Sequence, residues 1–158
     1  MTVAETVRQS LESAGVEYQL VAHPRSATTR ETAAAAEVPA DHVAKAVILR
    51  DDTGFVMAVI PGSNWIRLHK LQQALNRPLR LALEAEAEGL FSDCRPGAVP
   101  CLGPAYGIET VVDEEIDALA NVYFEAGDHE LLVRVSGEDF RKLLRGARRE
   151  FFSHPDAH

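Results

Sequence analysis

Two apolar segments rich in β-branched residues restrict the fold of this chain more than any other feature. Lys45 to Arg50 reads Lys-Ala-Val-Ile-Leu-Arg, and Phe55 to Ile60 reads Phe-Val-Met-Ala-Val-Ile. Only Asp51-Asp-Thr-Gly54 separates them, an acidic turn that ends in glycine, so the pattern predicts a β-hairpin. Because neither strand alternates apolar with polar residues, both faces must be covered, and we expect the hairpin to lie centrally in a sheet.

Helices and further strands are predicted on either side of this hairpin. Capping boxes at Thr2-Val-Ala-Glu5 and Thr28-Thr-Arg-Glu31 predict two helices, which end at Gly15 and Pro39. Ser136 is expected to cap the last helix. Strands are predicted over 17–21, 65–68, 79–83, 108–112, 121–125 and 131–135, and shorter helices over 69–76 and 84–90.

These elements mix without a regular βαβ period, and several strands are linked as hairpins. The pattern favours a mixed α/β fold, in which a curved mixed β-sheet or partial barrel is surrounded by helices. We expect a single domain over residues 1–152, followed by a flexible tail over residues 153–158.

The segment 95–107, Arg-Pro-Gly-Ala-Val-Pro-Cys-Leu-Gly-Pro-Ala-Tyr-Gly, contains three of the eight prolines and three of the ten glycines. Proline removes an amide donor and fixes φ, whereas glycine permits positive φ and close approach to the backbone. The segment is more apolar than a linker without a structural or functional role would be. It predicts a rigid, partly buried loop that presents amides around Gly97 and Gly103 to a ligand. The alternative is a tight crossover whose glycines serve packing alone.

Composition narrows the class of protein. A hydrophobic content of 46% and a charged content of 25% are typical of globular domains. No run of eighteen apolar residues and no apolar N-terminal signal is present, so we expect a cytoplasmic protein without a membrane span. The two cysteines, Cys94 and Cys101, suit a reducing compartment and lack the spacing of a zinc site, so no metal is expected.

Single residues offer few chemical candidates, because the common catalytic motifs are missing. Lys45 opens an apolar strand, where a lysine is either a guard of a sheet edge or a placed functional cation. His129 follows Gly127-Asp128 at a turn, where it either faces a pocket or is structural. Cys101 is a weak candidate nucleophile, since nothing in the sequence marks its thiolate as stabilised.

A net charge of -8 argues against a general nucleic-acid coat, but it leaves room for a local basic patch. Six of the sixteen basic residues fall within positions 134–149. This cluster either meets phosphates or is a solvated helix end, where cations are favoured in any case. Its members are Arg134, Arg141, Lys142, Arg145, Arg148 and Arg149.

The order of several short motifs resembles that of the YbaK/prolyl-tRNA-synthetase editing-domain family, over about Leu11 to Leu144. These motifs are Lys45-Ala-Val-Ile-Leu, Pro61-Gly62, Lys70-Leu71, Pro96-Gly-Ala-Val-Pro-Cys-Leu-Gly103, Val112-Asp113 and Gly127-Asp-His129. The family loop often carries Pro-Pro or Pro-Phe-Gly where this chain has Pro100-Cys101-Leu102-Gly103. This difference falls in the lining of the pocket, so it bears on which amino acid the protein recognises.

The resemblance implies a trans-acting deacylase that hydrolyses mischarged aminoacyl-tRNA without metal or organic cofactor. The substrate ester is already activated, and its neighbouring 2′-hydroxyl can assist attack, so the protein supplies position and oxyanion stabilisation. Backbone amides at Gly97 would polarise the carbonyl, Lys45 would hold the terminal nucleotide or neutralise charge, and His129 would position the substrate. The implied substrate-binding residues are Ala98, Val99, Pro100, Cys101 and Gly103.

The implied partner is the 3′ acceptor end of an aminoacyl-tRNA. For the oligomeric state, a monomer and a dimer are both compatible with the sequence. A small amino acid such as Ala or Ser, on tRNA-Pro or a related tRNA, is expected because Ala98, Val99 and Cys101 suggest a small pocket. The alternative from another class is a module that binds tRNA or an aminoacyl nucleotide without turnover. A general small-molecule hydrolase is the third possibility.

Overall fold

The computed structural model describes residues 2–26 and 28–156, and the mixed α/β class is confirmed. Within these residues the strands form three sheets. A five-stranded mixed sheet has the order β5(Arg80–Leu81), β2(Ala44–Asp51), β3(Gly54–Pro61), β6(Glu109–Asp113), β9(Arg148–Glu150). A three-stranded antiparallel sheet has the order β1(Gln19–Ala22), β8(Leu131–Ser136), β7(Asn121–Glu125). The third sheet pairs β10(Ser153–His154) with β4(Trp65–Ile66).

The predicted hairpin is confirmed, with Lys45 opposite Ile60 and Asp51 opposite Gly54. The Asp51 carboxylate closes the turn by accepting the amides of Thr53 and Gly54, and it also accepts two hydrogen bonds from Arg77. The Arg77 guanidinium holds the pKa of Asp51 well below its usual range. Strand β3 lies between β2 and β6, whereas β2 is flanked on its other side only by the two residues of β5.

Two cores explain why both faces of the hairpin are apolar. Met57 and Val59 of β3 belong to one core, shared with the three-stranded sheet and the first and last helices. Val56, Ala58 and Ile60 alternate with them and belong to the other core. Successive side chains of a strand point to opposite faces, so this alternation confirms the predicted cover on both sides.

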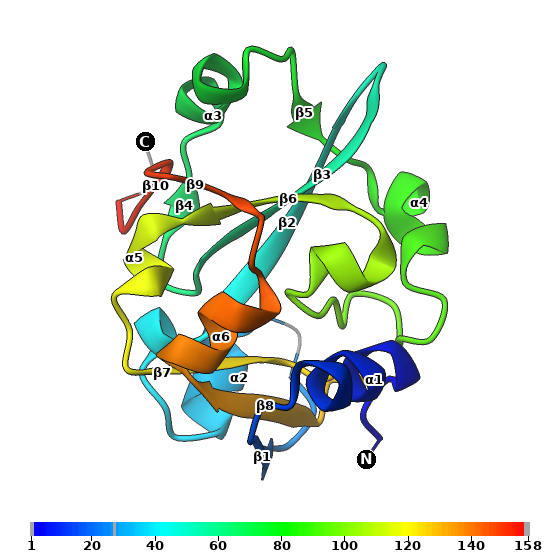
Figure 1. The fold of residues 1–158 in the computed structure, drawn as a ribbon, viewed down its shortest axis with the longest axis vertical. Helices are drawn as coiled ribbons and strands as arrows, with labels where there is room; N and C mark the ends of the chain where they lie inside the picture. Colours follow the sequence, from blue (N-terminus) through cyan, green and yellow to red (C-terminus); the bar gives the residue numbers. More distant parts are fainter. Residues whose placement is uncertain (1, 27, 157–158) are drawn as a thin grey trace.

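Helices lie at both ends of the molecule and, as α4 and α5, on either side of its middle (Figure 1). Helices α1, α2 and α6 lie with the three-stranded sheet, and the hairpin extends from there towards α3 and β5. The helices are α1(Glu5–Ala14), α2(Thr29–Ala35), α3(Leu68–Leu75), α4(Glu84–Ala87), α5(Glu114–Asp117) and α6(Gly137–Leu143), with 3₁₀ turns η1(Ala40–His42), η2(Glu88–Leu90) and η3(Gly103–Tyr106). No described helix has both the length and the apolar character that a membrane crossing requires.

Of the two predicted helix caps near the N-terminus, one is confirmed and the other is wrong. Thr28 caps α2 as expected, because its hydroxyl accepts the Glu31 amide at 3.1 Å, although α2 ends at Ala35, before Pro39. The capping box at Thr2 is wrong: α1 starts after Ala4 without a side-chain cap. The Thr2 amide donates instead to the Asp128 carboxylate at 2.6 Å, which ties the start of the chain to the turn between β7 and β8.

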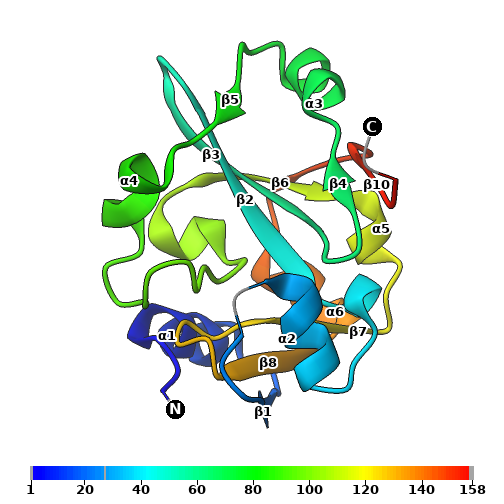
Figure 2. The same cartoon turned by 180° about the vertical axis from the view of Figure 1, so that it is seen from behind.

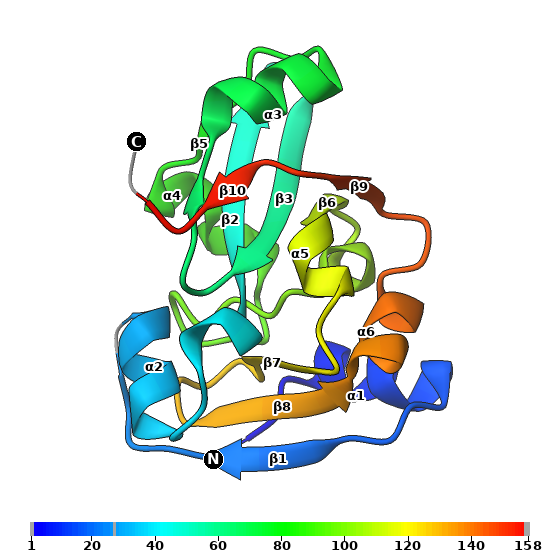
Figure 3. The same ribbon diagram turned by 90° about the vertical axis from the view of Figure 1, so that its left-hand side faces the viewer.

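The predicted flexible tail is wrong for Ser153 and His154, which pair with Ile66 and Trp65. Figure 3 shows this C-terminal segment, in red, crossing in front of the hairpin. Phe152 anchors it, because this residue is completely buried in the second core, the one that contains Val56, Ala58 and Ile60. The Asp113 carboxylate accepts the Phe152 amide and the Ser153 hydroxyl, so burial and two hydrogen bonds together order the segment.

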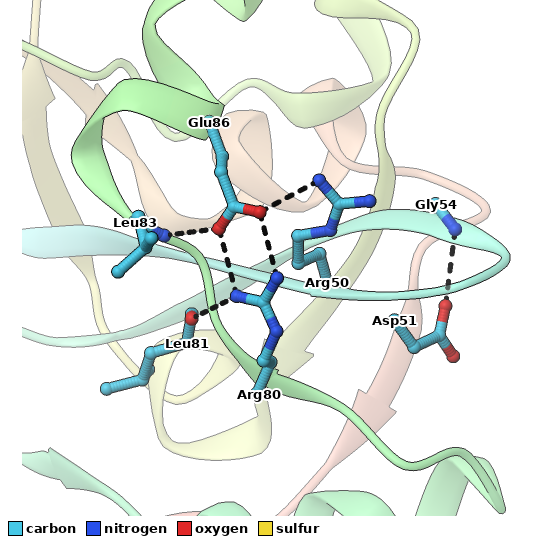
Figure 4. Close-up of polar contacts among 7 residues, drawn as sticks. All are labelled: Arg50, Asp51, Gly54, Arg80, Leu81, Leu83 and Glu86. Atoms are coloured by element: carbon cyan, nitrogen blue, oxygen red, sulfur yellow. Dashed lines mark hydrogen bonds and ion pairs between the residues drawn. The ribbon is translucent and has the colours of Figure 1, made fainter.

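A carboxylate at α4 fixes the segment that leads into the loop over 95–107 (Figure 4). Glu86 accepts two hydrogen bonds from Arg80 of β5, one from Arg50 of β2 and one from the Leu83 amide. The bonds from Arg80 and then from the Leu83 amide lower the pKa of Glu86 to about 2. Bidentate pairs of this kind fix geometry as well as charge, so α4 is held against the sheet.

Candidate functional site

Four segments far apart in the sequence enclose a small pocket of about 110 Å³. They are α2 with the residues before it, the start of β2, the first part of the 95–107 loop, and the turn between β7 and β8 with the adjoining strand ends. Figure 2 shows α2 beside the start of β2. The lining residues are Ser26, Thr28, Thr29, Thr32, Val43, Ala44, Lys45, Ala46, Gly97, Val99, Glu125, His129 and Leu132.

Lys45 lines this pocket as a half-buried cation. Its ammonium has no hydrogen-bond or ion-pair partner among the described residues and lies 5.6 Å from the centre of the Trp65 ring. Burial lowers the pKa of Lys45, and the nearby Arg30 guanidinium lowers it further. Arg30 is held in place by donating to the Ser63 carbonyl at 2.9 Å. Desolvating a cation without an anion costs free energy, so this arrangement favours binding of an anionic or carbonyl group.

The turn after β7 is organised by the Glu125 carboxylate. One of its oxygens accepts the amides of Gly127, Asp128 and His129, at 3.0, 3.2 and 3.1 Å. These bonds hold His129 at a φ of 66°, a left-handed conformation that few residues other than glycine adopt. The backbone strain at His129 is therefore offset by three hydrogen bonds to a charged acceptor.

His129 in turn holds the start of the loop. Its Nε2 donates to the Pro96 carbonyl at 2.7 Å, and the Arg95 amide donates to the Gly127 carbonyl at 2.9 Å. Because a carbonyl only accepts, Nε2 carries the proton, and neutral His129 leaves Nδ1 unprotonated. Through its hydrogen bond to the Pro96 carbonyl, His129 positions Gly97 and its neighbours.

Two loop residues that line the pocket have amides without a hydrogen-bond acceptor among the described residues. They are Gly97 and Val99. The Ala98 amide between them is already used, because it donates to the Arg95 carbonyl at 3.0 Å. Gly97 has a φ of 80°, which side-chain-bearing residues rarely adopt. Two unused amides near a cation are the donors that an oxyanion requires.

The rest of the predicted loop residues do not line the pocket. Ala98 and Pro100 are buried beside it, and the Cys101 thiol, fully buried, donates to the Ala44 carbonyl at 3.2 Å. Gly103 is packed so closely that an added Cβ would lie 2.0 Å from the Thr110 hydroxyl. The first part of the loop therefore faces the pocket, whereas the second part serves packing, as the alternative interpretation proposed.

Sequence reasoning missed Glu125 and the hydroxyl side chains at the α2 end of the pocket. Ser26 and Thr32 are hydrogen-bonded to each other at 2.7 Å, and Thr28 is the cap of α2. The capping pattern located Thr28 but not its position at a pocket. An acidic residue directly before Ala126-Gly-Asp-His129 could have signalled that a carboxylate collects the amides of this turn.

The basic cluster over 134–149 lies elsewhere and is largely engaged. β8 runs between α2 and α6, so α6 and the pocket lie at opposite ends of that strand (Figure 3). Arg141 donates to the Asp117 carbonyl, Arg148 to Glu150 and the Ala74 carbonyl, and Arg149 to Asp117 and two carbonyls. Within residues 2–26 and 28–156, no group of three or more His, Cys, Asp or Glu side chains could hold a metal ion.

Comparison with solved structures places the fold among known relatives. The hypothetical protein APE2540 superposes with a TM-score of 0.83 at 25% identity, covering 95% of this chain and 100% of that one. A candidate trans-editing enzyme for prolyl-tRNA synthetase superposes with a TM-score of 0.80 at 24% identity, covering 96% of each chain. A candidate signal-transduction protein from Marinobacter aquaeolei VT8 has a TM-score of 0.75 at 27% identity.

That last match covers 94% of this chain but 30% of the other, so the chain spans about a third of that longer relative. No curated protein matches this chain. The model of the aminoacyl-tRNA editing domain family matches residues 23–143, which include Lys45, the loop and His129. This match takes in well over half of the sequence, and the chain therefore belongs to the aminoacyl-tRNA editing domain family.

Proposed function

We propose that this protein is a trans-acting deacylase, which hydrolyses the ester of tRNA that carries a wrong, small amino acid. The observation that supports it best is the small pocket in which an unpaired ammonium, from Lys45, accompanies the unused amides of Gly97 and Val99. Membership of the editing-domain family gives the substrate class. The fold is also shared with a candidate trans-editing enzyme for prolyl-tRNA synthetase.

The proposed chemistry asks little of the side chains. An aminoacyl ester is activated, and the neighbouring hydroxyl of the terminal ribose can assist the attack on its carbonyl. The amides of Gly97 and Val99 would donate to the oxyanion, and Lys45 would neutralise developing charge or hold the terminal nucleotide. His129 acts as a positioning residue, because its Nε2 is bonded to the Pro96 carbonyl.

The volume of the pocket supports a small aminoacyl group. The pocket has a volume of about 110 Å³, against about 640 Å³ for the open groove lined by residues 65–70. A group the size of alanine or serine is compatible with this space, and the Ser26 and Thr32 hydroxyls could meet a serine side chain. The cognate tRNA is proposed to be tRNA-Pro or a related species, by analogy with the fold neighbour.

Single-turnover hydrolysis of mischarged tRNA tests this function. We expect Ala-tRNA-Pro or Ser-tRNA-Pro to be deacylated much faster than the correctly charged Pro-tRNA-Pro, with the uncatalysed rate subtracted. Tight binding of the same tRNAs without accelerated hydrolysis would favour the non-catalytic binding module. Hydrolysis of simple amino-acid esters at comparable efficiency would favour a general hydrolase.

Both thiols are expected to be dispensable. Burial raises the pKa of Cys94 to about 12 and raises that of the fully buried Cys101 beyond the usual range, so neither forms a thiolate at neutral pH. A Cys94→Ser, Cys101→Ser double variant should keep its single-turnover rate within about tenfold of wild type, and chelators should have no effect. A larger loss in a folded variant would indicate a thiol nucleophile.

The alkaline limit of activity should report on Lys45. If the ammonium is the active form, the rate falls as pH rises through its pKa, which lies below the ordinary value of about 10.4. Arg30→Gln removes a repelling charge but keeps a donor for the Ser63 carbonyl, so the pKa of Lys45 rises and the limb moves to higher pH. An unchanged limb in this variant would show that another group controls it. The pocket lining also contains the Glu125 carboxylate. Its Oε1 is already engaged, because it accepts hydrogen bonds from the amides of Gly127, Asp128 and His129.

A further inference from the structure

Trp65, the single tryptophan of the chain, is exposed although it lies in an ordered strand. The residue is 51% exposed, whereas its strand neighbour Ile66 is partly buried against the second core. One side of the ring meets the Lys45 ammonium at 5.6 Å from its centre. Trp65 therefore adjoins the pocket through the cation that the pocket and the ring share.

Trp65 also borders an open groove of about 640 Å³, lined by residues 65–70 and Asp156. Three side chains of this groove are basic or can become so, namely Arg67, His69 and Lys70, and all three are exposed. Among the described residues, no ion pair involves Arg67 or Lys70. With Arg30 and Lys45, this makes a basic path on a protein whose net charge is -8.

The path has a definite direction in the fold. It starts at α2, which carries Arg30, passes the start of β2 with Lys45, and continues along β4 to the start of α3 (Figure 2). Pairing of Trp65 with His154 of β10 fixes the strand, and the Arg67 amide donates to the Phe152 carbonyl at 2.7 Å. The backbone that carries the ring is thus held on both sides, beside the cation that lines the pocket.

We propose that Trp65 is a stacking platform for the unpaired 3′ nucleotides of the substrate tRNA. This inference rests on the proposed function, which puts the terminal ribose ester in the adjoining pocket. Exposed aromatic rings bordered by cations bind single-stranded nucleic acid, because a base stacks on the ring while the cations meet the backbone phosphates. Here the base nearest the ester would stack on Trp65, and Arg67 and Lys70 would meet the phosphates that follow it.

The alternative is that Trp65 only shields Lys45 from solvent. A cation over a ring is stabilised by the ring quadrupole even at exposed sites, so this contact by itself requires no ligand. A shield, however, does not need the open groove that Trp65 also borders, with its exposed cations. The two interpretations differ in one measurable respect, which is whether single-stranded RNA perturbs the ring.

Intrinsic fluorescence reports on this position directly, because the protein has no other tryptophan. We would titrate the wild-type protein with an uncharged tRNA-Pro acceptor minihelix that carries its unpaired 3′ nucleotides, and with a blunt minihelix that lacks them. Stacking predicts saturable quenching by the first and little by the second. Equal responses to both minihelices would overturn the proposal, since duplex contacts would then explain the binding.

Variants quantify the effect with a labelled minihelix and anisotropy. Loss of one stacked base predicts that Trp65→Ala binds roughly 5- to 150-fold more weakly, and Trp65→Phe should recover part of the affinity. Tyr18→Ala is the matched control, because Tyr18 is an exposed aromatic residue before β1 that lines neither the pocket nor the groove. Thermal melts establish that each variant is folded. Equal affinity for Trp65→Ala and Tyr18→Ala would overturn the platform.

The same assay separates this inference from the proposed function. Binding of uncharged RNA needs no turnover, so a stacking signal without deacylation would contradict the deacylase and leave the platform in place. Deacylation with an unaffected Trp65→Ala variant would contradict the platform alone. In single-turnover assays, stacking predicts that Trp65→Ala raises the half-saturating protein concentration far more than it lowers the maximal rate.

Discussion

Replacing Lys45 by Ala is expected to lower the single-turnover deacylation rate at least a hundredfold while the fold stays intact. The ammonium lines a small pocket, has no acidic partner among the described residues, and is partly removed from water. Charge stabilisation in such an environment is commonly worth about 3 kcal/mol, which corresponds to roughly a hundredfold in rate. Because the unpaired cation is costly to desolvate, its loss should leave the melting temperature near or above that of wild type.

The measurement is the hydrolysis of mischarged tRNA by enzyme in excess, beside a thermal melt. Lys45→Arg tests whether charge alone suffices, since it keeps the cation but changes its shape and donor geometry. Lys142→Ala is the matched control, because Lys142 is an exposed lysine of α6, away from the pocket. Wild-type rates for Lys45→Ala would identify Lys45 as a guard of a sheet edge and would remove it from the proposed site.

Gly97→Val should abolish most of the activity for a different reason. Gly97 has a φ of 80°, and a β-branched side chain is strained in that conformation whatever space surrounds it. A Cβ would also lie 3.6 Å from the His129 ring, so the further methyl groups of valine would press on the residue that holds the loop. We expect at least a hundredfold loss of rate and a lower melting temperature, because the Gly97 and Val99 amides would move away from the oxyanion position.

The control for backbone strain is Gly107→Val. Gly107 has a similar φ of 70°, and nothing lies within 4 Å of its potential Cβ, so valine there adds strain without touching the pocket. Both variants should lose stability, but only Gly97→Val should lose its rate at a temperature where both are folded. If Gly107→Val lost as much activity, general loosening of the loop would account for the effect, and the oxyanion assignment would be wrong.

The sequence by itself determined the features that depend on neighbours in the chain. The run over 45–60 predicted the hairpin, because apolar residues at successive positions require cover on both faces of a strand. Thr28 and Ser136 predicted their caps, since a hydroxyl accepts an amide three residues later. Proline and glycine likewise predicted an irregular 95–107 loop, because they restrict or extend the φ values of their own residues.

Only the tertiary structure decided which residues share the pocket. Gly97 and Gly103 are equivalent in the sequence, yet Gly97 faces the pocket and Gly103 is packed against Thr110. The physical reason is that a pocket forms where separate segments meet, and no local pattern encodes that meeting. The same holds for Glu125, whose carboxylate shapes a turn that holds the loop through His129.

The C-terminal segment and Trp65 give the same lesson at the surface. Ser153 and His154 resemble a frayed end in the sequence, but Phe152 is fully buried in the second core, and Asp113, 39 residues earlier than Phe152, accepts its amide. That anchoring pairs β10 with β4 and presents Trp65 beside Lys45. Periodicity and capping act over a few residues, whereas order at a chain end and contact between a ring and a cation depend on surfaces that exist only after folding.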